Sequence, residues 1–80
     1  MKFQFRPKWK EELVVIAEEG SFKLDLAMGV LTAFLPTEED WPDKSPTWAR
    51  DLYPVLKREL EAWCAENKAN LVIDTTGVVS

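Results

Sequence analysis

Residues 11–28, EELVVIAEEGSFKLDLAM, decide the fold of this chain. In the second half of the stretch, apolar side chains occupy every second position from Phe22, with Lys23 and Asp25 between them. Such alternation is typical of a strand that faces a core on one side and water on the other. The glycine-containing pair at 19–20 is a turn signal, so the pattern predicts a β-hairpin.

The first half of the stretch, residues 11–18, is ambiguous. Trp9, Leu13 and Ile16 recur at helical spacing and the glutamates favour a helix, whereas the β-branched run 14–16 favours a strand. We interpret it as a strand, because the turn and the alternating arm that follow it would then complete the hairpin.

Other short strands flank the hairpin. Residues 2–6 alternate polar and apolar and are expected to form a strand that Pro7 ends. Beyond Gly29, which permits a bend or bulge, residues 30–35 are apolar enough for a third strand of the meander. Residues 71–73 are expected to form the last strand, at the centre of the sheet or at its edge.

A helix is expected to begin at Ser45-Pro46, because serine caps a helix well and proline suits its first position. The apolar residues then recur in one stripe, namely Trp48, Leu52, Val55, Leu56, Leu60, Trp63 and Cys64. Pro54 interrupts this stripe, so the helix either kinks or consists of two pieces, with Asp51 capping the second and Asn67 near its end.

These elements predict one domain, residues 1–80, of the α+β class with two layers. An antiparallel sheet of three to four strands would carry one main helix on one face, in the order β-β-β-α-β. At 80 residues, with 46% apolar side chains and a single cysteine, the chain has to stabilise itself through one core without a disulfide.

Composition excludes several kinds of chemistry. The chain has no histidine, which removes the common zinc sites and the Ser-His and Cys-His catalytic pairs. Its three glycines are too far apart to cradle a phosphate, and Cys64 lies on the apolar stripe, where a thiol acts as a small hydrophobe. We therefore expect no enzyme, no cofactor and no metal. Because no apolar run is long enough to span a bilayer, we expect a cytoplasmic protein without membrane contact.

Four tryptophans in 80 residues need an explanation. Trp48 and Trp63 lie on the helix stripe and are expected in the core, where an aromatic ring buries about 150–250 Å². Trp9 and Trp41 lie outside the strongest periodic segments. For these two, the core and an exposed partner contact remain equally open.

Trp41 lies within an acidic loop that contains Glu38, Glu39, Asp40 and Asp43. The spacing of the carboxylates matches no calcium loop, so a solvated loop is the simpler interpretation. An exposed Trp41 among these acids would nevertheless suit a basic protein partner. The net charge of −4 favours such a partner over a phosphate backbone.

The N-terminus has the opposite charge. It interleaves basic and aromatic residues as a single-strand nucleic-acid platform does, in Lys2, Phe3, Phe5, Arg6, Lys8 and Trp9. A strand whose basic residues face water and discourage edge pairing is the better interpretation, because the remainder of the chain is acidic.

The sequence therefore predicts a non-catalytic protein-interaction module, such as an inhibitor, an immunity-type protein or an adaptor. Its size and charge are those of many small binding proteins of bacteria and phages. Two alternatives remain: a single-stranded nucleic-acid-binding module that uses the basic aromatic N-terminus, and a homodimer in which a sheet edge or an apolar face pairs with itself.

Overall fold

The hairpin expected within residues 11–28 forms in the computed structural model, which describes residues 1–80. Strands β2 (Glu12–Ala17) and β3 (Gly20–Ala27) pair antiparallel from Ala17 opposite Gly20 to Glu12 opposite Asp25. The apolar positions of β3 are buried and its polar positions are exposed. Residues 12–17 are therefore a strand, and the helical alternative is wrong.

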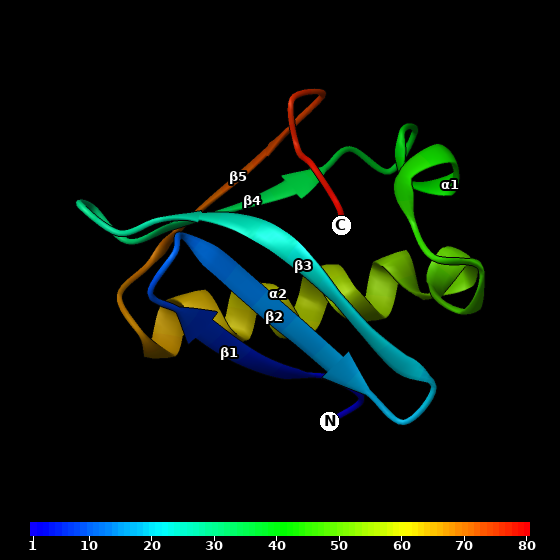
Figure 1. Cartoon of the computed structure of the whole chain (residues 1–80), viewed down its shortest axis with the longest axis horizontal. Coiled ribbons are helices and arrows are strands. Elements are labelled where there is room, and N and C mark those ends of the chain that lie inside the picture. The colour runs from blue at the N-terminus through cyan, green and yellow to red at the C-terminus, as the bar shows by residue number, and fades with distance from the viewer.

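Three further strands complete a five-stranded sheet in the order β1-β2-β3-β4-β5 (Figure 1). They are β1 (Gln4–Lys8), β4 (Thr32–Pro36) and β5 (Asn70–Asp74). The α+β class is confirmed, but the sheet has five strands rather than three to four. The run after Gly29 is a separate strand behind a turn, which makes the order β-β-β-β-α-β. The last strand lies at the sheet edge, parallel to β4, whereas the other pairings are antiparallel.

The main helix consists of two pieces, as one of the two alternatives predicted. A 3-10 helix, η1 (Thr47–Leu52), leads directly into the α-helix α2 (Tyr53–Glu66). Pro54 lies in the first turn of α2, where its missing N–H removes no helical hydrogen bond. The residue at the cap position is Leu52 rather than Asp51, and no side chain caps the helix.

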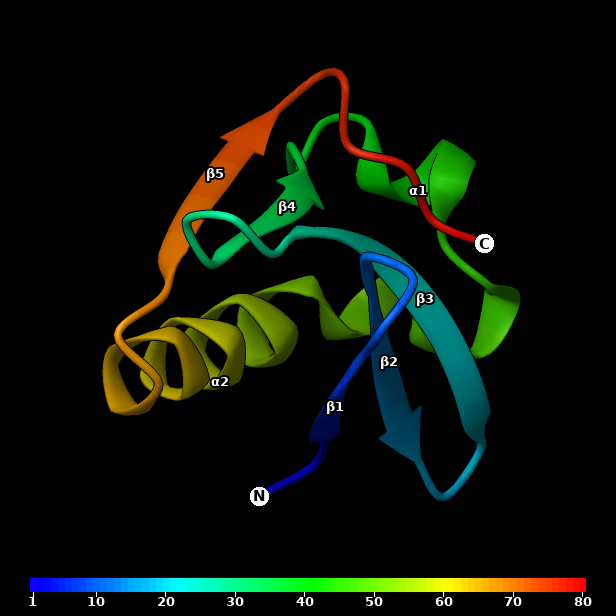
Figure 2. The same cartoon turned by 60° about the vertical axis from the view of Figure 1, so that its left-hand side comes forward.

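The helix covers one face of the sheet and leaves the other face uncovered (Figures 1 and 2). The core lies between these layers and contains Phe22, Leu24 and Leu26 from β3 together with Leu56 and Leu60 from α2. Trp48 and Trp63 are half-buried against this core, and Cys64 is buried in it. We call the uncovered side of the sheet the open face. None of the helices is both long and apolar enough to cross a membrane.

The last residues of the chain return across β4 to the free side of β3. Lys23 and Ser80 exchange both backbone hydrogen bonds, at 2.8 and 3.0 Å. A Cβ atom added to Gly77 would lie 2.6 Å from the backbone nitrogen of Pro36, so only glycine fits at this crossing. The Lys44 ammonium donates to the carbonyls of Thr75 and Gly77 at 2.9 and 2.7 Å. These bonds hold residues 75–80 in place, and we call this segment the strap.

Candidate functional surface

The acidic loop follows β4 and includes the short helix α1 (Trp41–Lys44), which contains Asp43. Its carboxylates Glu38, Glu39 and Asp43 are exposed, and Asp40 is half-buried. Asp40 also closes the turn before α1, because its backbone N–H donates to the carbonyl and hydroxyl oxygens of Thr37. No group of three possible metal-binding side chains is present in the chain.

Trp41 does not belong to the exposed surface of this loop. Its side chain is 1% exposed, and its indole N–H donates to the carbonyl of Ala49 at 3.0 Å. The ring packs against Phe22 and Tyr53, with centroid separations of 5.6 Å in both cases. An exposed anchor at Trp41 is therefore wrong, and the loop presents carboxylates alone. The helical period of the stripe could not reveal this, because α1 is a separate element.

Tyr53 closes the same cluster from the helix side. Its hydroxyl donates to the carbonyl of Pro36 at 2.7 Å. Burial and, second, the carboxylate of Glu38 raise the pKa of Tyr53 above its ordinary value. The neutral phenol holds the end of β4 onto α2.

The structure does not bring the six N-terminal residues together on one surface. Phe3 is buried, with its backbone N–H on a carboxylate oxygen of Glu59 at 2.8 Å. Phe5 is half-buried on the helix side, 6.1 Å from Trp63 between ring centroids. The Lys2 ammonium is paired with Glu19 at 2.7 Å. Only three of the six, Arg6, Lys8 and Trp9, are exposed.

Trp9 is the most exposed large apolar side chain of the protein, at 92%. It lies in the turn between β1 and β2, where Glu11 adopts the left-handed conformation with φ 61°. A shallow depression, lined also by Glu12 and Val14, joins it to Lys8, Lys10 and Lys23. We call Trp9 and these three lysines the tryptophan patch. Strand alternation could have predicted that Lys23 points outward, but only the hairpin register brings it beside this turn.

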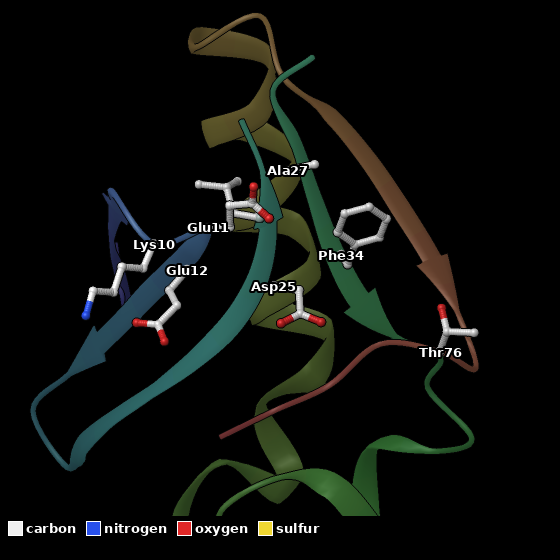
Figure 3. Close-up of a pocket in the computed structure, with 8 residues that line it drawn as sticks. Lys10, Glu11, Glu12, Asp25, Ala27, Phe34 and Thr76 are labelled. Carbon is white, nitrogen blue, oxygen red and sulfur yellow. The ribbon is translucent and has the colours of Figure 1, made fainter. Parts of the chain in front are cut away.

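A second depression lies beside this patch, on the open face where β3 separates from β4 (Figure 3). We call it the acidic hollow, because its lining includes the carboxylates of Glu11, Glu12 and Asp25; the remaining lining residues are Lys10, Leu26, Ala27, Phe34 and Thr76. The Lys23 ammonium lies 3.6 Å from Glu12 and links the hollow to the tryptophan patch. The sequence did not suggest this site, since its residues come from three strands, a turn and the strap.

The open face therefore joins an exposed indole and several ammonium groups to a group of carboxylates within one surface. Such an arrangement can bind a partner that carries both signs of charge around an apolar pocket. No family model matches the chain, and neither a curated protein nor a solved structure matches it.

Proposed function

We propose that this chain is a non-catalytic protein-interaction module, acting as an inhibitor, immunity-type protein or adaptor, and that its partner binds the open face with Trp9 as the anchor. The observation that carries the proposal is the 92% exposure of Trp9 beside three lysines. The other three tryptophans of the chain all pack in or against the core. Trp9 is thus the one whose ring remains free for a partner.

The energetics favour such a role. A tryptophan ring that moves into a partner pocket buries about 150–250 Å², which amounts to roughly 4–6 kcal/mol of gross stabilisation at ~25 cal/mol per Å². Tryptophan is enriched among the residues that dominate binding energy for this reason. Trp9 sits in a turn between two paired strands, so little backbone ordering would be needed on binding.

The charged groups of this chain indicate which charges the partner surface carries. The acidic hollow and the acidic loop both suit lysines or arginines of a partner, in keeping with the net charge of −4. The ammonium groups of Lys8 and Lys10 suit a smaller acidic region around the pocket that receives Trp9. The partner surface would therefore be mainly basic, with acidic groups at the anchor.

The test is capture of the partner from a lysate of the source organism by the wild-type chain and by Trp9→Ala. We expect the substitution to abolish capture, because it removes the anchor without touching the core. Val30→Ala is the matched control, since Val30 is 71% exposed in another turn. Equal capture by wild type and Trp9→Ala, with both chains folded, would refute the anchor.

A quadruple variant separates the two acidic regions. Changing Glu38, Glu39, Asp40 and Asp43 to their amides removes the charge of the loop and leaves the open face intact. We expect a small loss of capture from reduced long-range attraction, and one that disappears at high salt. A complete loss that persists at high salt would move the binding surface to the loop.

A single-stranded nucleic acid is the second candidate ligand. It is supported by the exposed Arg6 and by the tryptophan patch, which combine stacking and positive charge. Glu12 and Asp25 oppose it, because a phosphate backbone that continued across the sheet would meet their carboxylates. Titration of a labelled oligonucleotide at low salt and then at increasing salt tests it; absence of binding at low salt excludes it.

A further inference from the structure

The two edges of the sheet differ in how well they are protected against pairing with another strand. β1 carries Arg6, Pro7 and Lys8, and both proline and exposed basic side chains discourage edge pairing. β5 reads NLVID and contains no proline, lysine or glycine. β4 is its only neighbour in the sheet, and its outer side is uncovered (Figures 1 and 2).

The direction of the backbone shows which groups of β5 are free. The Asn70 N–H donates to the carbonyl of Leu31 at 2.8 Å, so the backbone groups of Asn70 point inward, towards β4. Because backbone groups alternate sides along a strand, those of Val72 and Asp74 also point inward, and those of Leu71 and Ile73 point outward. No hydrogen bond from a turn, loop or side chain uses the backbone of Leu71 or Ile73.

We propose that β5 pairs antiparallel with β5 of a second copy of this chain, around a two-fold axis at Val72. Leu71 of each copy then lies opposite Ile73 of the other, and both residues of each such pair have outward backbone groups. This is the hydrogen-bonded type of antiparallel pair, so the two pairs supply four backbone hydrogen bonds. The two sheets become one continuous ten-stranded sheet.

Side chains favour this register over its neighbours. Asn70 of one copy faces Asp74 of the other, so an amide donor meets each carboxylate and no two carboxylates are opposed. A shift that placed Ile73 opposite Ile73 would bring the two Asp74 side chains closer. A shift the other way would recruit Lys68, whose φ of 55° takes it out of an extended strand.

The flanking surface is also self-compatible. Ile73 is 38% exposed and shares a depression with Lys57, Arg58, Glu38 and Glu61, two basic and two acidic side chains. Because these charges balance, two copies of this edge do not repel each other through net charge. In the dimer, Ile73 packs against Leu71 of the other copy and is shielded from water. A contact built on one strand is small, so the dimer is expected to dissociate on dilution.

Sedimentation tests the proposal over about 1 to 500 µM, the range in which small interfaces associate. The mass of the wild-type chain should rise from 9.2 kDa towards twice that value. Ile73→Lys places a charge on the edge and should remain monomeric throughout. Gln4→Lys makes the same change in charge on β1 and should dimerise like wild type.

Two further variants make the result specific. Ile73→Pro removes an outward N–H and leaves the β4 ladder intact, so it should also abolish the dimer; circular dichroism verifies the fold of each variant. Trp9→Ala should dimerise normally, which separates this interface from the open-face proposal. A wild-type chain that stays monomeric over the whole range overturns the inference and leaves the edge to a strand of another protein, and an Ile73→Lys dimer as stable as wild type overturns it too.

Discussion

The two tryptophans that periodicity left undecided end in opposite environments. Trp41, among carboxylates, is 1% exposed, whereas Trp9, among lysines, is 92% exposed. Each directly follows a charged residue, Lys8 or Asp40, so neighbouring sequence does not separate them. The indole N–H of Trp41 donates to a backbone carbonyl, and its ring packs against two other aromatic rings. Trp9 lies at the end of a hairpin, beyond the reach of the core. Burial of an aromatic ring depends on where its connection lies relative to the layers.

The largest expected effect on stability comes from truncating the Trp41 ring, and the same truncation at Trp9 is the comparison. Trp41→Ala should lower the free energy of unfolding by about 3–5 kcal/mol, because it leaves a cavity and an unpaired Ala49 carbonyl. Trp9→Ala should change it by less than about 0.5 kcal/mol. Urea unfolding followed by circular dichroism measures both, and equal losses would contradict the difference in burial. Trp41→Phe keeps a ring and should lose about 1–2 kcal/mol, mainly from the hydrogen bond.

The second effect concerns the strap that holds the Trp41 region through Lys44. Gly77→Ala should destabilise the chain by about 1–3 kcal/mol, because the new methyl group meets the backbone of Leu35 and Pro36. Hydrogen exchange at the amides of Lys23 and Ser80 should accelerate, since the strap loses its position. Gly29→Ala is the matched control, because nothing lies within 4 Å of its added Cβ. Unchanged protection at Lys23 in Gly77→Ala would show that the strap is not held by this crossing.

The third effect is a pH dependence at Tyr53, the only tyrosine of the chain and a neighbour of Trp41. Burial and the Glu38 carboxylate raise its pKa, so the folded state favours the neutral phenol. The stability it contributes is complete below the ordinary value of 10.0 and is lost as pH rises through the folded pKa. Tyrosinate absorbance should therefore appear at higher pH in the folded chain than in urea.

Tyr53→Phe provides the control for this titration. It should lose about 1 kcal/mol with the hydrogen bond to Pro36 and remove the tyrosinate signal. The stability difference between wild type and this variant should shrink as the pH rises above 10.0. A tyrosinate signal that appears at the same pH in folded and unfolded wild type would contradict the buried hydroxyl.

The fold was accessible to sequence reasoning where pattern and turn chemistry agree. The alternation after Phe22 predicts β3 correctly, and with the turn at 19–20 it also resolves the ambiguous strand before it. Two expectations are wrong for the same reason: a local sequence pattern does not show which elements will lie beside the one that it predicts. Pro7 was expected to end β1, yet it is tolerated within β1 because this strand lies at an edge. The sheet was also expected to be antiparallel, yet β5 pairs parallel to β4. The direction of β5 depends on where the end of α2 lies relative to the sheet, which the sequence of β5 does not show.

The candidate surface was less predictable than the fold. The N-terminal pattern contains Lys8 and Trp9, but period-two alternation sends Phe3 and Phe5 to the opposite face from Arg6. That division was available from the predicted strand itself. The acidic hollow was not, because Glu11, Asp25 and Thr76 meet only through the sheet register and the strap.

The smallest effect tests the turn that presents Trp9. Glu11 adopts φ 61°, a region that costs a residue with a Cβ about 1–2 kcal/mol relative to ordinary backbone. Glycine carries no such penalty but is more flexible when unfolded, so Glu11→Gly should raise the free energy of unfolding by about 0.5–1 kcal/mol. Lys68, at φ 55° after α2, is the matched site, and Lys68→Gly should give a similar gain. Glu11→Gln controls for the carboxylate, because it removes the charge that Glu11 contributes to the acidic hollow and keeps a side chain at this position. If Glu11→Gly stabilises the chain and weakens partner capture more than Glu11→Gln does, the turn holds Trp9 in a conformation that the partner requires; equal capture by the two variants would mean that this conformation is not required.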